Sequence, residues 1–520
     1  MAATANRQWY FRFVNVYTIS AFLSLGVALI GFDISSMSGV LGTHQYQDFY
    51  GNPLGARQGA ITGAMAAGSF VSALFAGSLG DQFGRKITMQ AGLLLWCIGS
   101  VVQSTSNGVA MLVAGRVISG LCIGLTASLI PTYQSEIAPH KIRGRIVSFQ
   151  SLAGAMGIMI QYFIQYGCSF INSEAAFRVP WAIQAGPAVI LFVGLFWFPR
   201  SPRWLASKGR WEEVLRVLAR LRTANNDVNN PFVLAEYKEI EDRVRLDLLE
   251  VPSNSIRDLF SPKMRRRVFL GMAIQIWSQL TGINIMMYYI VYILESAGIR
   301  NVLLASSAQY IINVVMTIPA IMWVDKWGRR PTLLVGAVSM AFWLFLIGGL
   351  LMAYGEPNPI PNQPTTWIVV DHPAVSRAIL AGSCLTVGSF AISWGPVSWI
   401  YQAEVVPLRV RARSVALSTA SNWAFNFVLA VFVPLLLRSI SWVMFFLFGS
   451  FNIAAFIHVW VAAPETKQRT LEEMDEIFEH GEQKPLWKSF TATRPTNKFD
   501  MLAKDIEMGK LIVHPPVSTF

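Results

Sequence analysis

The sequence has little charge and few cysteines, and both shortages limit what the protein can be. Only 14% of its 520 residues are charged, against about 25% in a soluble domain, whereas 53% are hydrophobic. Water therefore cannot be the solvent for most of the surface. The four cysteines (Cys97, Cys122, Cys168 and Cys384) are scattered through apolar stretches, so neither a disulfide framework nor a cysteine metal site is predicted.

Motifs for catalysis are also missing. The sequence has no pattern typical of a nucleophile–base pair, a metal-binding cluster or a phosphate-binding loop, so we expect no enzyme, no metal and no cofactor. The net charge of +12 raises the question of nucleic-acid binding, but Arg and Lys cluster in short connections between apolar stretches. That distribution is typical of charges that orient a membrane protein, and nucleic acid is not an expected partner.

What the sequence does contain is long apolar stretches, each near the 20 or so residues with which a helix crosses a bilayer. Twelve are predicted, at 14–41, 58–80, 88–106, 109–132, 146–168, 180–199, 268–296, 303–324, 331–354, 377–401, 414–437 and 440–463. Connections rich in Arg and Lys alternate with connections that hold isolated cations, so the positive-inside rule predicts cytoplasmic termini. We expect an all-α multi-pass membrane protein without a cleavable signal peptide.

The spans form two groups of six around one long polar stretch. The predicted organisation is a cytoplasmic tail (1–13), a six-helix half (14–199), a cytoplasmic linker (200–267), a second six-helix half (268–463) and a cytoplasmic tail (464–520). Apolar residues at helical spacing predict short helices in the linker, packed under the bundle. The proline-rich connection at 355–376 predicts a stiff external loop.

Three charged loops recur in the same order in both halves. The pattern Glu136, Pro139, Arg143 returns as Glu404, Pro407, Arg411; the segment 80–86 is echoed by 324–330; and 199–203 stands where 464–468 stands. A repeat of this kind predicts a duplicated bundle with two pseudo-symmetric halves. Within these loops we expect two clusters of ion pairs that act as an intracellular gate, unless the charges only fix topology. The predicted gate residues are Asp81, Arg85, Glu136, Arg143, Asp325, Arg329, Glu404 and Arg411.

Two charges stand out deep inside predicted spans, where ionisable groups are expensive and usually paired or functional. Asp33 lies nine residues before Gly42, and Arg116 lies eight residues after Gly108. At 1.5 Å per residue both sit roughly 12–13 Å below the outer face, so the two helices can bring them together. Such a pair is either a static salt bridge or a site that gains and loses a proton; the matched depth favours the proton site.

Neutral amides are unusually frequent in the spans, above all on the seventh. Amides donate and accept hydrogen bonds, which suits a ligand rich in hydroxyl groups, and an indole can stack on the apolar face of a ring. Each amide alone could instead join two helices. The substrate-binding residues predicted from this pattern are Gln150, Gln161, Gln279, Asn284, Tyr288, Asn313, Trp399 and Asn422.

Together these motifs resemble the sugar-porter family of the major facilitator superfamily, and residues 277–289 are similar to fungal high-affinity glucose transporters. The resemblance implies a twelve-helix transporter with a central hexose site and no cofactor beyond the coupling proton. It implies sugar contacts from Gln150, Gln279, Asn284, Asn313, Trp399 and Asn422, with Phe390 lining the site. Family symporters carry Asp where this chain has Asp33. Relatives often have two glutamines where this chain has Ser278 and Gln279, which leaves the sugar open.

The sequence therefore predicts a proton-coupled monosaccharide symporter of the plasma membrane, working by alternating access as a functional monomer. Its expected substrate is a hexose such as glucose, with xylose an open alternative. Two other functions stay open: a facilitative sugar uniporter in which Asp33 is structural, and a transporter-like sugar sensor. The short stretch after Pro464 disfavours the sensor, since such receptors carry long signalling tails.

Overall fold

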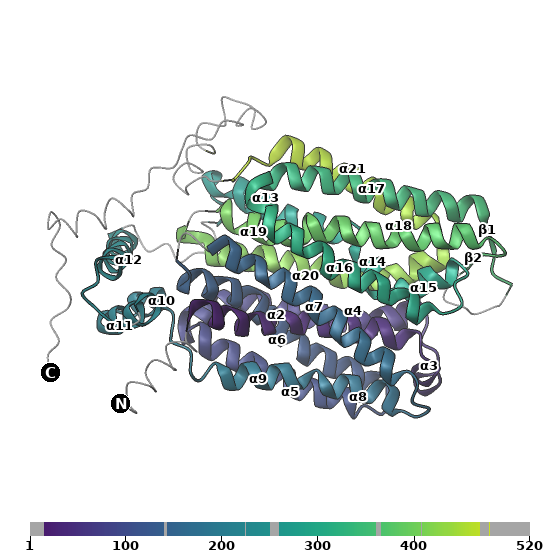
Figure 1. The fold of residues 1–520 in the computed structure, drawn as a ribbon, viewed down its shortest axis with the longest axis horizontal. Helices are drawn as coiled ribbons and strands as arrows, with labels where there is room; N and C mark the ends of the chain where they lie inside the picture. The colour runs from purple at the N-terminus through teal and green to yellow at the C-terminus, as the bar shows by residue number, and fades with distance from the viewer. Residues whose placement is uncertain are drawn as a thin grey trace.

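The protein is a bundle of long helices in two halves, as a computed structural model of the chain shows (Figure 1). The structure describes residues 15–139, 143–223, 225–249, 259–359, 366–406, 408–467 and 478. The predicted tails 1–13 and 464–520 therefore lie outside it, apart from 464–467 and Phe478. In Figure 1 the purple and blue helices of the first half lie below the green and yellow helices of the second.

In the first half, here the N half, the predicted spans correspond to seven helical segments. They are α2 (Val16–Leu41), α4 (Ala56–Phe83), α5 (Arg85–Ser104), α6 (Val109–Ile137), α7 (Arg143–Cys168), α8 (Ala175–Ile183) and α9 (Ala185–Gly194). The second, the C half, consists of α13 (Pro262–Leu280), α14 (Ile283–Tyr288), α15 (Ile290–Ser296), α16 (Val302–Trp327), α17 (Arg329–Tyr354), α18 (Pro373–Ile392), α19 (Trp394–Glu404), α20 (Leu408–Ser439) and α21 (Val443–Ala462). Each half thus holds the helices of six predicted spans.

Ten helical stretches in the described part of the chain are long and apolar enough to cross a membrane. The predicted spans 146–168 and 268–296 are helical but are not among these ten. In the first of them, α7 carries several glutamines on its buried side, including Gln150, Gln161 and Gln165. The second is divided into α13, α14 and α15, so it has no single long helix.

The break between α13 and α14 occurs at Gly282, whose backbone is left-handed with φ of 86°. A residue with a Cβ would be strained there, so glycine is the residue that this turn requires. Two carbonyls at the end of α14, before the second break at Tyr289, accept hydrogen bonds from side chains of α16. Gln309 Nε2 donates to Met286 O over 2.6 Å, and the Tyr310 hydroxyl donates to Met287 O over 3.1 Å. Helix α16 therefore holds the broken helix in place.

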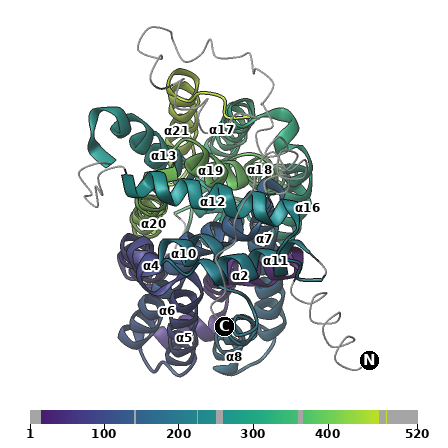
Figure 2. The same ribbon diagram turned by 90° about the vertical axis from the view of Figure 1, so that its left-hand side faces the viewer.

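Three polar helices lie across one end of the bundle, which we name the linker end (Figure 2). They are α10 (Pro202–Ser207), α11 (Trp211–Arg222) and α12 (Pro231–Leu249), within the stretch predicted to hold short helices. Arg222 on α11 makes two 2.7 Å hydrogen bonds to Glu236 on α12 and donates to Ile137 O at the end of α6 over 2.9 Å. One arginine thus fixes the linker helices to the N half.

The opposite end, the hairpin end, carries two elements that the sequence did not predict. A short helix, α3 (His44–Tyr50), follows α2, and two strands, β1 (Gly355–Pro357) and β2 (Trp367–Val369), pair antiparallel. The predicted stiff loop at 355–376 is therefore a small hairpin at its base. Three-residue strands leave too short an alternation of polar and apolar residues to be recognised.

The two halves touch closely at the hairpin end. A Cβ placed on Gly59 of α4 would lie 2.6 Å from the Val431 carbonyl oxygen of α20, so only a glycine allows this approach. Nearby, the hydroxyls of Ser38 on α2 and Tyr310 on α16 are 2.6 Å apart. Backbone packing and a hydrogen bond therefore close this end between the halves.

Candidate functional site

The buried charges Asp33 and Arg116 form an ion pair between α2 and α6. Arg116 Nη2 lies 2.8 Å from Asp33 Oδ2, and both side chains are 0% exposed. The contact expected from their matched depths is confirmed, whereas their role in proton coupling stays a prediction. The Gly31 and Gly157 backbones allow α2 and α7 to pack closely beside the pair, because a Cβ on either would meet backbone atoms.

The hydrogen bonding of this pair is incomplete. Arg116 Nη2 also donates to Thr62 O over 3.3 Å, but Asp33 Oδ1 and the Arg116 atoms Nε and Nη1 have no hydrogen-bond partner within the described residues. A buried pair with unsatisfied atoms is costly to maintain, and removal of one partner costs about 3–5 kcal/mol. This geometry fits a site that changes state better than it fits a purely stabilising bridge.

Tyr288 connects this pair to the other half. It lies on α14, is 1% exposed, and interacts electrostatically with Asp33, with Arg116 and with the Asn426 side chain. The sequence placed Tyr288 among the substrate-binding residues, and the structure puts it between the ion pair and the amides of the C half. A change of charge on Asp33 is therefore felt by a residue beside these amides.

The C half holds a cluster of three amides from three helices, which we name the amide cluster. Asn284 Nδ2 donates to Gln279 Oε1 over 2.5 Å, and Asn426 Nδ2 donates to the same oxygen over 3.2 Å. Asn426 Oδ1 has no partner in the described part of the protein. Gln279 and Asn284 were predicted site residues; Asn426 is one of the amides counted within the spans, but it was left out of the predicted substrate-binding residues. The signal that could have found Asn426 is its position four residues, or one helical turn, after the predicted Asn422.

A second amide contact lies beside this cluster. Asn422 Nδ2 donates to Gln275 Oε1 over 2.7 Å, and Gln275 Nε2 donates to Ser398 O over 3.3 Å. In the N half, Gln150 donates to Gln134, which in turn donates to Ser20 O over 2.9 Å. These amides fix one another by hydrogen bonds. They place polar side chains inside an otherwise apolar bundle, where a ligand could bind them.

The other predicted substrate residues are less clearly grouped. Gln161 is completely buried and donates to Pro180 O over 3.0 Å, which joins α7 to α8 within the N half. Asn313 on α16 is buried, with 6% of its surface exposed, and within the described ranges no side-chain hydrogen bond joins it to the amide cluster. Phe390 and Trp399 are half-buried; Phe390 packs in the C half, and Trp399 packs against a cluster formed mainly by the N half. The structure therefore brings together Gln279, Asn284, Asn422 and Tyr288 in one region and sets Gln161 apart.

The predicted gate residues form one ion-pair cluster in each half at the linker end. In the N half, Arg85 lies 3.0 Å from both Asp81 and Glu136. In the C half, Arg329 makes two bonds to Glu404, of 3.1 and 2.9 Å. Arg143 and Asp325 have side chains outside the described part of the chain.

The C-half cluster also contains residues that the sequence did not assign to it. Glu465 accepts hydrogen bonds from the backbone of Arg329 and Arg330, and Thr466 donates to Glu404 over 2.6 Å. The available signal for Glu465 and Thr466 was their place in the 464–468 motif, since that loop repeats the position of 199–203.

Arg411, a predicted gate residue, donates to Val406 O, over 3.4 and 3.2 Å from two of its nitrogens.

The site thus combines one ionisable pair, neutral hydrogen-bonding groups and two charged clusters. In the described part of the protein, no group of three His, Cys, Asp or Glu side chains is placed to hold a metal. Amides beside aromatic rings can bind a neutral polyhydroxylated molecule, and a carboxylate can carry a proton. These groups are suited to binding and transporting a small neutral molecule rather than to cleaving a bond.

Comparison with known proteins gives the same answer. The sequence profile described as "Sugar (and other) transporter" matches residues 18–478. The "MFS glucose transporter mfs1" of Aspergillus flavus is 50% identical over 513 residues, which cover 96% of each chain. The "High-affinity glucose transporter" of Kluyveromyces lactis is 42% identical, over 91% of this chain and 87% of that one.

The fold is also that of a solved transporter. The proton:xylose symporter XylE, in a complex with 6-bromo-6-deoxy-D-glucose, superposes with a TM-score of 0.73 at 24% identity, over 89% of this chain and 99% of that one. The chain is a multi-pass membrane protein that moves sugars, and it is not an enzyme. It belongs to the sugar transporter family of the major facilitator superfamily.

Proposed function

We propose that the protein is a proton-coupled symporter for a monosaccharide, with glucose the expected substrate, in the plasma membrane. The observation that carries the coupling is the ion pair of Asp33 and Arg116, buried in the bundle with one carboxylate oxygen unpartnered in the described residues. A carboxylate in this position can be neutral or charged, and each form favours different neighbours. Glucose is favoured because the relatives at 50% and 42% identity are named glucose transporters.

In the proposed cycle the protein begins open to the outside, with Asp33 protonated and no longer paired to Arg116. Sugar binds between the halves at Gln279, Asn284 and neighbouring amides. The hairpin end then closes and the two charged clusters at the linker end separate. Sugar leaves inward, Asp33 releases its proton to the cytoplasm, and the pair with Arg116 forms again.

The proposed orientation places the linker end in the cytoplasm together with both termini. It follows from the cations at that end, which include Arg85, Arg329 and Arg411, because positive loops stay inside. The substrate then enters from the hairpin end. The protein works as a monomer in this proposal, because each chain carries both halves of the sugar path.

One proton moving with each sugar would supply about 2.3 kcal/mol per 100 mV of membrane potential, enough for roughly 50-fold accumulation. The test is uptake of labelled glucose by purified protein in proteoliposomes, at two external pH values, with and without an uncoupler, and with xylose, galactose, a polyol and a disaccharide as competitors. A symporter concentrates glucose, does so faster at acidic external pH, and loses accumulation when the uncoupler is added. Equilibration without accumulation under every condition would identify a uniporter instead.

A further inference from the structure

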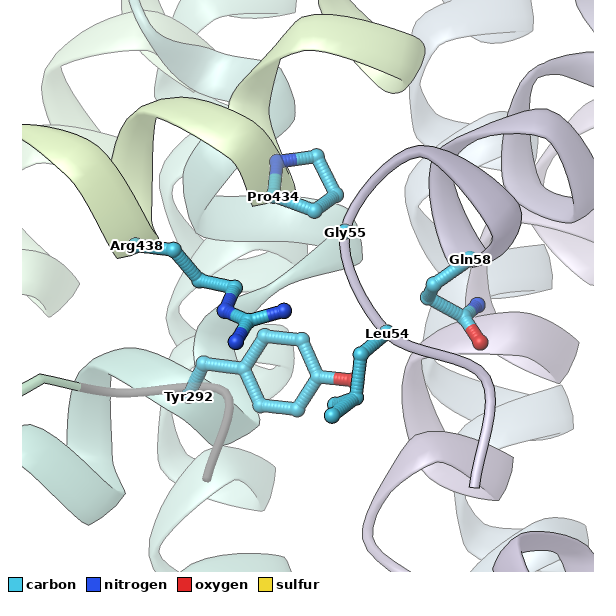
Figure 3. Close-up of a pocket in the computed structure, with 6 residues that line it drawn as sticks. All are labelled: Leu54, Gly55, Gln58, Tyr292, Pro434 and Arg438. Atoms are coloured by element: carbon cyan, nitrogen blue, oxygen red, sulfur yellow. The ribbon is translucent and has the colours of Figure 1, made fainter. Parts of the chain in front are cut away.

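A small pocket opens between the halves at the hairpin end (Figure 3). Its lining comes from the start of α4 on one side and from α15 and α20 on the other. The lining residues are Leu54, Gly55, Gln58, Tyr292, Pro434 and Arg438. None of these residues was predicted to have a function, and the sugar site described above does not include them.

Gln58 forms the wall of this pocket that faces the N half. It is 1% exposed, and in Figure 3 its amide points away from Arg438 and Tyr292. On that inner side, Gln58 Nε2 donates to Thr62 Oγ1 over 3.1 Å, and the Tyr46 hydroxyl donates to Gln58 Oε1 over 3.2 Å. One side chain therefore separates the pocket from buried polar groups of the N half.

These polar groups continue to the ion pair. Thr62, one helical turn beyond Gln58, accepts a 3.3 Å hydrogen bond from Arg116 Nη2 through its carbonyl oxygen. The same nitrogen lies 2.8 Å from Asp33 Oδ2. A chain of contacts thus leads from the pocket wall to the carboxylate of Asp33, through Gln58, Thr62 and Arg116.

The carboxylate itself has room for a proton. Asp33 Oδ2 is held by Arg116, whereas Oδ1 is buried and has no hydrogen-bond partner among the described residues. A proton can therefore bind Oδ1 before the contact of Oδ2 with Arg116 is lost. Protonation would then weaken that contact, because the attraction depends on the charge of the carboxylate.

The titratable groups around this path are few and can be named by helix. Arg116 on α6 and Tyr288 on α14 face Asp33. Tyr46 on α3 and Tyr289 between α14 and α15 face Arg116. At the pocket, Arg438 on α20 and Tyr292 on α15 line the space, and Glu295 on α15 interacts with Tyr292.

We propose that this pocket is the outer port through which protons reach the Asp33–Arg116 pair, and that Gln58 is the positioning residue that closes it. The inference rests on the proposed proton coupling. A water molecule in the opened port carries the proton inward and transfers it to Asp33 Oδ1. The carboxylate becomes a carboxylic acid, the water is left neutral, and Arg116 keeps its charge. The proton then passes from this pocket along α4 to the ion pair of the N half, whereas the sugar passes to the amide cluster of the C half.

The first test compares Gln58→Leu with Gln45→Leu, an amide at the same end that donates to Ile171 O outside this path. Two rates are measured in proteoliposomes: glucose uptake driven by an inward proton gradient, and glucose counterflow at equal pH without a potential. Gln58→Leu is expected to slow proton-driven uptake about tenfold while counterflow keeps at least half its rate. Gln58→Glu, which can bind and pass a proton, restores proton-driven uptake, and Gln45→Leu changes neither rate.

Three results would overturn this assignment. Equal slowing of both rates by Gln58→Leu would make Gln58 only structural, and no slowing of either would remove it from the path. If the wild-type protein takes up no protons with glucose, both the proposed function and the proton port are wrong. If the wild type is proton-coupled but Gln58→Leu leaves its proton-driven uptake unchanged, only the proton port is wrong.

A second test uses the charge at the mouth of the port. Arg438 repels protons, so Arg438→Glu is expected to move the external pH of half-maximal uptake upward. The expected shift is roughly 0.2–0.6 pH unit for two unit charges acting over about 10 Å, with and without salt screening. The dependence on internal pH stays unchanged. Arg377→Glu, the same charge change at an exposed residue of α18 outside the pocket, controls for general surface charge; equal shifts in both variants would contradict the port.

Discussion

The two halves share one frame but bury different chemistry. In the N half, the central polar feature is a charged pair, Asp33 with Arg116. In the C half it is the neutral amide cluster of Gln279, Asn284 and Asn426. The position of the C half that corresponds to Arg116 in the repeat is Cys384, which is a buried free cysteine. Duplication thus preserved the helices, whereas the residues that face the interior diverged toward separate tasks.

At the linker end the halves have stayed alike. Each has an arginine at the start of a helix paired with the glutamate that ends a later helix, Arg85 with Glu136 and Arg329 with Glu404. The C-half cluster is the larger one, because Thr466 also bonds Glu404. The repeated motifs therefore mark the shared frame of the two halves, whereas the residues in which the halves differ mark their separate chemistry.

The largest expected effect comes from removing the buried carboxylate of the N half, Asp33. Asp33→Asn cannot bind and release a proton, so we expect loss of glucose accumulation, with counterflow retained. Accumulation is measured as the steady-state ratio of internal to external labelled glucose in proteoliposomes under a proton gradient. If the Asp33→Asn variant still accumulates glucose, the assignment of proton coupling to the N half is wrong.

Stability has to be controlled in that experiment, since Asp33→Asn leaves Arg116 buried without its carboxylate, at a cost of about 3–5 kcal/mol. The double variant Asp33→Asn with Arg116→Gln removes both charges and is expected to recover much of the lost thermal stability without recovering accumulation. Asp48→Asn makes the same chemical change on exposed α3 of the same half, and it should leave accumulation intact.

The next effect concerns the C half. Gln279→Ala removes the oxygen that both Asn284 and Asn426 bind, so we expect the KM for glucose to rise about 10- to 100-fold, equivalent to about 1.4–2.7 kcal/mol. The proton-to-sugar ratio should not change. Initial uptake rates over a range of glucose concentrations, with proton flux recorded in parallel, measure both quantities.

Gln161→Ala tests whether the buried amide of the N half also contributes to the sugar site. Its amide donates to Pro180 O, so we expect a change of less than about threefold in KM and a loss of stability near 1 kcal/mol. A large rise in KM for Gln161→Ala would return this residue to the sugar site predicted from the sequence.

A smaller effect is expected at the charged clusters. Glu404→Gln loses a carboxylate with two bonds to Arg329, whereas Glu136→Gln loses one bond to Arg85. We expect both variants to lower the maximal uptake rate, by about three- to tenfold for Glu404→Gln and less for Glu136→Gln, because the state closed at the linker end is weakened. The reverse order of effects would show that the N-half cluster is the dominant gate.

The smallest effect tests the attachment of the linker helices to the N half. Arg222→Ala removes bonds to Glu236 and to Ile137 O in a largely buried setting, at an expected cost of about 1–2 kcal/mol in thermal stability. Arg216→Ala removes a pair with Glu212 that is mostly exposed, so its cost should be near zero. Detergent-solubilised protein and a fluorescence melting curve suffice for both.

The sequence predicted the features that depend on distance along one helix. The spans follow from length and hydropathy, and the meeting of Asp33 with Arg116 followed from counting residues from the helix ends. Contacts that depend on how one helix is rotated against another could not be derived this way. Asn426 faces Gln279 and Gln161 faces Pro180 because of rotations that packing of the whole bundle sets, and a single sequence does not report them.

The interruptions of helices were the other weak point. A glycine inside an apolar run is common in membrane helices, so Gly282 alone did not mark the turn that divides α13 from α14. The second break, at Tyr289, became visible only with Gln309 and Tyr310 on α16, which bind the carbonyls of Met286 and Met287 at the end of α14. Such partners lie more than 20 residues away in the sequence, and no local pattern links them.

The close approach at Gly59 has a consequence for the balance between conformers. Because a Cβ there would meet the Val431 carbonyl oxygen, one added methyl group would act as a steric wedge at the hairpin end. The wedge touches neither the amide cluster nor the ion pair. In the proposed cycle, Gly59→Ala is therefore expected to favour the state open to the outside while the binding residues stay native, so that the absence of a single carbon atom would tune the balance between conformers.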